Sequence, residues 1–266
     1  MDATHQTALR RVGKSELKLW SKYISMDNYN DGDLCNYAVT SEILESKKNP
    51  VCVDIGADKG EWGLYVLKQN PSAKILMFEP NPISFKQLQE SVKENVFIKC
   101  FNVAISNKVG TLQMSLEGPN SRADVTGTQS VDCRLLEAYV STHVDIIKID
   151  TEGHDMIILE SLFPLVERGL VGSIVTEFTP YWYGNSIFEC FAKTFHILEK
   201  MLTHYKYCYS LSRRGKPSLQ EITADTLEEF ILIHYNKHIQ TDLYFVNIQP
   251  SLPVFSSFNL MYNETC

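Results

Sequence analysis

The sequence predicts a doubly wound α/β fold: a mostly parallel sheet of seven strands with an antiparallel strand pair at its C-terminal end. Short apolar runs alternate with helical stretches from residue 50 onward, and strands separated by helices in one chain pair in parallel. The run Ile75-Leu76-Met77-Phe78 is apolar throughout, which is typical of an interior strand covered on both faces. These observations indicate a sheet with helices on both sides.

The strands follow from short apolar runs bounded by turn residues. They are expected at residues 51–55, 74–79, 96–102, 145–150, 171–177, 205–210 and 242–248. The last two form the antiparallel pair. A further strand is expected at 111–116, and residues 117–130 are polar and rich in Gly, Ser and Thr, so we expect a loop there.

Capping and breaking residues delimit the helices. Asn70, which precedes a proline, ends the first helix. Asn81 and Pro82 supply the N-cap and the first residue of the second. Thr226 and Glu229 form a capping box at the start of the last. The helices are expected at residues 59–69, 82–95, 153–162, 188–204 and from Thr226 onward.

The chain of 266 residues is interpreted as a single domain, residues 1–266, because no linker, repeat or low-complexity tract divides it. Residues 1–49 are interpreted as a polar helical lead-in or lid, and residues 50–266 as a Rossmann-like core. The lead-in has three apolar residues that can anchor it, namely Leu17, Leu19 and Trp20.

The run of residues 27–33 resembles a calcium-binding loop in composition. Tyr29 and Ala38, however, stand at positions where such a loop needs oxygen ligands. We therefore expect a turn in this segment rather than a metal site.

Charge and composition exclude several classes of partner. The net charge is −7 and the pI about 5.5, and no basic stripe marks a nucleic-acid interface. No apolar stretch reaches the roughly eighteen residues of a membrane span, and the N-terminus lacks an apolar signal core. The 7 cysteines form no Cys-x-x-Cys pair, which argues against a thiolate zinc site or a disulfide framework. A cytoplasmic location is expected.

A glycine-containing turn joins the first expected strand to the first helix. Gly56 and Gly60 allow the backbone to turn tightly and to approach a ligand closely. Glu79 ends the second strand, about 20 residues further on, where a carboxylate can accept both hydroxyls of a ribose. A plain strand-to-helix turn is the alternative interpretation of the glycines alone. Together with Glu79, they favour a nucleoside-binding site.

An acidic residue distinguishes this turn from a dinucleotide site. Dinucleotide folds place a second glycine two residues after the first, so that a pyrophosphate can sit on the helix N-terminus. Here Asp58 occupies that position, and Asp54 lies just upstream. These carboxylates would repel a pyrophosphate but suit a cofactor that carries an ammonium and a sulfonium group.

Four segments together resemble the FkbM family of S-adenosylmethionine-dependent methyltransferases in order and spacing, over about residues 50–180. They are Val53–Gly60, Phe78–Pro82, Asn102–Ser106 and Ile147–His154. The last segment is the most specific to the family, and Asp58 departs from it, since the family usually has Asn there. These segments give no resemblance for residues 1–50 and 185–266.

The resemblance implies a Rossmann-like fold and S-adenosylmethionine as the methyl donor. It implies that Asp54, Gly56 and Gly60 shape the methionine pocket, that Glu79 holds the ribose, and that residues 102–104 lie along the adenine. The cofactor-binding residues expected on this basis are Asp54, Gly56, Ala57, Asp58, Gly60, Glu79, Pro80, Asn102, Val103, Ala104 and Asp150.

Charged residues gather at two expected strand ends. Lys148, Asp150 and Glu152 alternate, so the end of an extended strand projects them to one side. Glu177 ends the next strand. Such groups are costly to bury unless they are paired. A structural Lys148–Asp150 ion pair is one interpretation. In the other, Asp150 or Glu177 is a base or a ligand of an acceptor hydroxyl, and Lys148 sets the orientation and pKa of the carboxylate.

Two further roles stay open for this charged set. Asp150, Glu152 and Glu177 can instead hold Mg²⁺, which prefers oxygen ligands, so dependence on a divalent metal is undecided. His154 at the helix start can be a base, although a lone histidine is more often a capping or packing residue. The catalytic candidates are Lys148, Asp150, Glu152, His154 and Glu177.

The aromatic run Tyr181-Trp182-Tyr183 follows the fifth strand, beside the expected site. It is either a wall of the core or a platform on which a sugar ring stacks. The first functional hypothesis is an O-methyltransferase that acts on a hydroxyl of a sugar or glycan, since the family resemblance implies hydroxyl acceptors. A small natural-product or phenolic hydroxyl is the alternative acceptor. A nucleotide-dependent oxidoreductase and a non-catalytic binding module are the alternatives of other classes.

Overall fold

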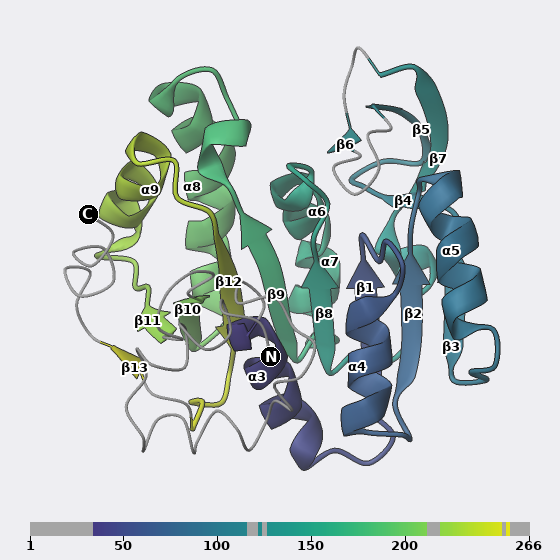
Figure 1. The fold of residues 1–266 in the computed structure, drawn as a ribbon. Coiled ribbons are helices and arrows are strands. Elements are labelled where there is room, and N and C mark those ends of the chain that lie inside the picture. The colour runs from purple at the N-terminus through teal and green to yellow at the C-terminus, as the bar shows by residue number, and fades with distance from the viewer. Residues whose placement is uncertain (1–33, 116–121, 124–126, 212–218, 252–253, 256–266) are drawn as a thin grey trace, which may run out of the picture.

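The N-terminal part of the described chain is a helix that packs on the sheet. The expected anchors Leu17, Leu19 and Trp20 and the expected turn at 27–33 lie outside the described residues. Of the lead-in, helix α3 (Leu34–Glu45) is described. The computed structural model describes residues 34–115, 122–123, 127–211, 219–251 and 254–255 (Figure 1).

The seven expected strands form the central part of the main sheet. Their order is β10-β12-β9-β8-β1-β2-β3, and among them β12 alone runs in the direction opposite to the other six strands. The expected antiparallel C-terminal pair is therefore confirmed. The strands are β1 (Val51–Ile55), β2 (Lys74–Phe78), β3 (Ile98–Phe101), β8 (Ile146–Ile149), β9 (Ser173–Phe178), β10 (Tyr207–Leu211) and β12 (Thr241–Val246).

Two short strands extend the sheet beyond β10, so that it has nine strands in the described residues where the sequence predicts seven. They are β11 (Leu219–Glu221), antiparallel to β10, and β13 (Val254–Phe255), parallel to β11. Strands of this length carry too little periodic pattern to be predicted from the sequence. They form because they add to the edge of the sheet at β10.

Helices cover both faces of the sheet (Figure 1). Because side chains alternate along a strand, Val53 and Ile55 of β1 join one core layer and Cys52 joins the other. The Cys52 layer is covered by α3, α4 (Glu61–Gln69) and α5 (Pro82–Val92). The opposite layer is covered by α6 (Asp155–Ser161), α7 (Phe163–Glu167), α8 (Ile187–His204) and α9 (Leu227–Asn236). None of the described helices combines the length and apolar character that crossing a bilayer requires.

Of the two predicted helix caps, one is confirmed and the other is wrong. The Asn81 side chain accepts a hydrogen bond from the Ile83 N–H at the start of α5, as expected. The capping box at Thr226 is wrong. The Thr226 hydroxyl accepts instead from the Thr223 N–H at 3.0 Å, and α9 begins without a side-chain cap. The Thr226 hydroxyl is used by the turn at residues 223–226 and is therefore not available to cap the helix.

A second, smaller sheet stands beyond the carboxyl ends of β2 and β3 (Figure 1). Its order is β4-β7-β5-β6. It confirms the expected strand at 111–116, but β7 starts inside the expected loop of 117–130, so that part of the loop prediction is wrong. Pairing with β5 over five register positions fixes β7 despite its polar sequence. The strands are β4 (Ala104–Ile105), β5 (Gly110–Ser115), β6 (Arg122–Ala123) and β7 (Gln129–Arg134).

The ends of β1 and β8 meet at Gly56, which has a φ of +81°. The Gly56 N–H donates to the carbonyl of Phe78 at 3.0 Å, and the Asp150 N–H donates to the carbonyl of Ile55 at 2.9 Å. A Cβ on Gly56 would lie 1.8 Å from the Asp150 carbonyl oxygen. Only glycine therefore fits where these strands leave the sheet.

We expect Gly56→Ala to lower the free energy of unfolding by about 3 kcal/mol or more, because the new Cβ adds a clash to an unfavourable backbone conformation. Gly169→Ala is the matched control: its φ is +67°, but a Cβ there meets nothing within 4 Å. The control should lose only about 1–2 kcal/mol. Urea denaturation measures both variants, and equal losses would contradict the close approach.

Candidate functional site

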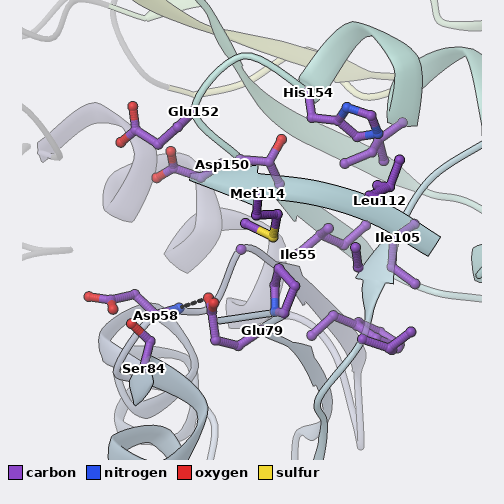
Figure 2. Close-up of a pocket in the computed structure, with 17 residues that line it drawn as sticks. Ile55, Asp58, Glu79, Ser84, Ile105, Leu112, Met114, Asp150, Glu152 and His154 are labelled. Carbon is purple, nitrogen blue, oxygen red and sulfur yellow. Dashed lines mark hydrogen bonds between the residues drawn. The ribbon is translucent and has the colours of Figure 1, made fainter. Parts of the chain in front are cut away.

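The main cavity opens at the carboxyl ends of β1 and β8 and has a volume of about 230 Å³ (Figure 2). The chain winds from β1 through β2 to β3 in one direction and from β8 to β9 in the other, and ligands of open α/β sheets bind at this switch point. The lining residues are Ile55, Gly56, Asp58, Phe78, Glu79, Pro80, Ser84, Val103, Ala104, Ile105, Leu112, Met114, Asp150, Thr151, Glu152, His154 and Ile158.

Glu79 lies buried on one side of the main cavity, just after β2. Its carboxylate accepts hydrogen bonds from the Asp58 N–H at 2.9 Å, drawn in Figure 2, and from the Asn81 N–H at 2.7 Å. Burial raises the pKa of Glu79 to about 7, although these two bonds act in the opposite direction. The carboxylate is thus fixed in place before any ligand arrives.

A second cavity of about 160 Å³ adjoins the main one on the side of α3 and α4. Gly56, Asp58 and Asp150 line both cavities, so the two spaces meet at these residues. Helix α3 contributes Asn36 and Tyr37 to the wall. These two residues are not predicted from the sequence, because nothing in a polar lead-in marks which side chains will face a cavity.

Asp54 is a fully buried carboxylate at the second cavity. Neither of its oxygens accepts a hydrogen bond from the described part of the chain. The Lys148 Nζ lies 3.8 Å from Asp54 Oδ1 and 3.0 Å from Asp150 Oδ2. Burial raises the pKa of Asp54 to about 6, against the opposing effect of Lys148. A cation that entered this cavity would find an acceptor with unused lone pairs.

The loop after β8 is held by Asp155, whose buried carboxylate accepts from the Thr151 N–H, the Thr151 hydroxyl and the Gly153 N–H at 2.9–3.0 Å. These bonds support the left-handed backbone of Glu152 (φ 54°) and Gly153 (φ 100°). A non-glycine residue in this conformation is uncommon and is maintained by its surroundings. Asp155 is not among the predicted site residues, although an acidic residue in the first turn of a helix is a signal that the sequence offers.

The expected catalytic residues do not all lie together. Figure 2 shows Asp150 and Glu152 on one side of the main cavity and His154 on the other. His154 Nε2 lies 3.0 Å from the Ser106 hydroxyl, and burial together with Lys108 lowers the pKa of His154 to about 4. The imidazole is therefore neutral near pH 7.

Glu177 lies apart from Asp150, Glu152 and His154. It is buried at the end of β9, accepts a hydrogen bond from Gln240 and is absent from the linings of both cavities. Across the described residues, no three His, Cys, Asp or Glu side chains are arranged to hold a metal ion. Asp150, Glu152 and Glu177 thus do not form a ready magnesium site.

Some of the expected cofactor residues line the cavities, and others support them. Ala57 lines the second cavity, and Pro80, Val103 and Ala104 line the main one. Asn102 instead donates from Nδ2 to the carbonyls of Glu79 at 2.8 Å and Pro80 at 3.1 Å, which fixes the segment after β2. Gly60, with a φ of +88°, starts α4, and a Cβ there would lie 2.7 Å from Leu88.

The aromatic run occupies the short 3₁₀ helix η3 (Pro180–Trp182) and the residue after it. Tyr183 is buried in the core, and its hydroxyl accepts from the Thr179 N–H at 3.3 Å. Tyr181 is half-buried and meets the Trp182 and His238 rings edge-on. Trp182 is 39% exposed and lines a groove on the far side of Gly153.

The fold and the paired cavities define a class: Rossmann-like α/β proteins that bind a nucleoside-containing cofactor at the sheet's switch point. Comparison with known families gives the particular family. The methyltransferase FkbM domain matches residues 54–209. Since this span is more than half of the chain, the protein belongs to the FkbM family of S-adenosylmethionine-dependent methyltransferases.

Individual proteins show more limited similarity. The methyltransferase sdnD of Sordaria araneosa is 34% identical over 77 residues, which are 28% of this chain and 30% of that protein. Among solved structures, the plantazolicin methyltransferase BpumL in complex with SAH is 14% identical, with a TM-score of 0.43, over 92% of this chain and 95% of that one. The precorrin-6y C5,15-methyltransferase of Geobacter metallireducens GS-15 is 14% identical, with a TM-score of 0.41, over 79% and 87%.

We expect Asp155→Ala to lower the free energy of unfolding by about 2–4 kcal/mol, because it leaves three donors of the loop after β8 without their acceptor. Asp132→Ala is the control, since its side chain is 63% exposed and should change stability by less than about 0.5 kcal/mol. Thermal and urea denaturation measure both. A stable Asp155→Ala protein would show that the loop holds its shape without this carboxylate.

Proposed function

We propose that this protein transfers a methyl group from S-adenosylmethionine to a hydroxyl oxygen of a sugar or glycan. The observation that carries the proposal is that the main and second cavities meet at Asp150, within the domain that defines the family. Methyl transfer requires a donor and an acceptor to be aligned at one point, and a carboxylate at that point can act on the acceptor proton.

The residues that line the two cavities fit S-adenosylmethionine. Glu79 would hold the ribose hydroxyls, and the apolar residues of the main cavity, such as Ile105, Leu112 and Met114, would cover the adenine. Asp54, whose buried oxygens accept no hydrogen bond from the described residues, would hold the ammonium of the methionine part. When bound, S-adenosylmethionine supplies an electrophilic methyl group on a sulfonium.

Asp150 has the position of the residue that handles the acceptor proton. Its Oδ2 accepts from Lys148 Nζ at 3.0 Å, which orients the carboxylate. A sugar hydroxyl is a weak acid, so a carboxylate that binds its proton makes the oxygen a better nucleophile. Glu152 lies beside it on the same side of the main cavity (Figure 2) and would orient the acceptor.

Thiols support a proposed cytoplasmic location. Six cysteines in the described residues are free, and five of them are buried. Unpaired thiols that are shielded from solvent are typical of proteins kept in a reducing compartment.

The FkbM match argues against the oxidoreductase alternative.

We expect the affinity for S-adenosylhomocysteine, measured by titration calorimetry, to rise with pH. The pKa of Asp54 is raised to about 6 and that of Glu79 to about 7 in the free protein, so both are protonated at low pH, whereas the ligand needs both carboxylates. The gain from about pH 5.5 to about pH 8 should be at least about tenfold. Glu79→Gln should weaken binding and flatten this dependence. An affinity independent of pH would refute the assigned roles.

We expect Asp150→Asn to lose turnover while keeping its fold. Amide replaces carboxylate at nearly constant volume, so the melting temperature should change by less than about 5 °C, whereas kcat should fall by about 100-fold or more. Asp132→Asn, on the surface, is the control and should keep full activity. Mass spectrometry of a panel of glycans, a catechol, a peptide and an RNA measures transfer. Methylation of non-sugar acceptors only would overturn the proposed acceptor.

A further inference from the structure

A groove of about 370 Å³ lies between α6 and α8, next to the loop that carries the active-site residues; we refer to it as the α6–α8 groove. Gly153 lines this groove, whereas its neighbours Glu152 and His154 line the main cavity. A single stretch of backbone therefore separates the two spaces. The groove and the main cavity are therefore neighbours on the two sides of this stretch of backbone.

Two exposed apolar side chains form one part of the groove. Trp182 on η3 is 39% exposed and Ile157 on α6 is 38% exposed. A Cβ on Gly153 would lie 3.5 Å from Trp182 Cε3, so the indole rests against the loop with part of its surface left open. Because both side chains line the same groove, they give it an apolar surface that a ligand can contact.

Polar side chains form the other part. Glu160 on α6 and Lys193 and His196 on α8 line the groove and are exposed. In the described part of the chain, none of these three side chains takes part in a hydrogen bond or ion pair. Together they offer a carboxylate acceptor, an ammonium donor and an imidazole that can do either. Glu160 and Lys193 have opposite charges, which favours neither a polyanion nor a strongly basic peptide.

We propose that the α6–α8 groove binds a neutral pyranose unit of the acceptor, next to the unit that is methylated. This inference rests on the proposed function. A pyranose has an apolar C–H face, which stacks on an aromatic ring, and a rim of hydroxyls, each of which donates and accepts. The groove presents the indole of Trp182 for the face and the mixed polar set for the rim. The preferred acceptor is then an oligosaccharide or a glycoside of at least two rings.

The test combines binding and turnover. An array of neutral mono-, di- and trisaccharides is probed with the protein without the methyl donor, and the KM values of a disaccharide and its matching monosaccharide are then measured with the donor. Trp182→Ala should weaken disaccharide binding and raise its KM by about tenfold, with the monosaccharide KM and the S-adenosylhomocysteine affinity unchanged. Lys193→Ala, on an exposed helix face, should raise the disaccharide KM about threefold.

Phe188→Ala is the matched control, because this aromatic residue is also on α8, is 83% exposed and is not part of the groove. It should leave every value unchanged. If sugars are methylated with the same KM by Trp182→Ala and Lys193→Ala, the subsite is refuted and the proposed function stands. If the array shows Trp182-dependent binding but no sugar is methylated, the groove is a sugar-binding surface, and the proposed function, together with the acceptor subsite that rests on it, is refuted. No binding to any sugar overturns the subsite.

Discussion

The contact between Gly56 and the carbonyl of Asp150 is the constraint on which the site depends. The ends of β1 and β8 approach so closely there that a Cβ would lie 1.8 Å from the carbonyl oxygen. That approach places Asp54 before the turn and Asp150 after the neighbouring strand on adjoining parts of one wall. The glycine thus does more than permit a turn. It sets how closely the strand ends that carry Asp54 and Asp150 approach each other, and Gly56 and Asp150 line both cavities.

Charge at this wall is unbalanced in the free protein. Lys148 is 3.0 Å from Asp150 and 3.8 Å from the more deeply buried Asp54. The pKa values of Asp54 and Glu79, raised by burial, exceed those of the unfolded chain. Their contribution to stability is thus present at low pH and lost as the pH rises through about 6 and about 7. A cationic ligand would offset the cost of burying an ionised carboxylate, because it places a positive charge next to that carboxylate.

The sequence could predict the parts of the molecule that local patterns determine. The strands predicted at 51–55 and 74–79 and the Asn81 cap depend on their own residues, and all three are found, the second strand as Lys74–Phe78. Other features depend on partners distant in the chain. The polar strand β7 exists because β5 pairs with it, Asn36 and Tyr37 reach the second cavity because α3 packs on α4, and Tyr183 is drawn into the core beside Phe178. The alternate spacing of Lys148, Asp150 and Glu152 predicts that they project to one side of a strand end. It could not show that Glu177 lies outside the linings of both cavities.

The bonding of Asp155 has a consequence for how relatives of this protein are interpreted. Its carboxylate holds the Thr151–Gly153 backbone through three hydrogen bonds, so the most recognisable stretch of the family pattern is also a folding element. A descendant that had lost catalysis would still be under selection to keep Asp155, Gly153 and Gly56, and would still match the family. Retention of the motif is therefore weak proof of an active enzyme. Under the proposed function, the positions that would report on activity are Asp54 and Asp150.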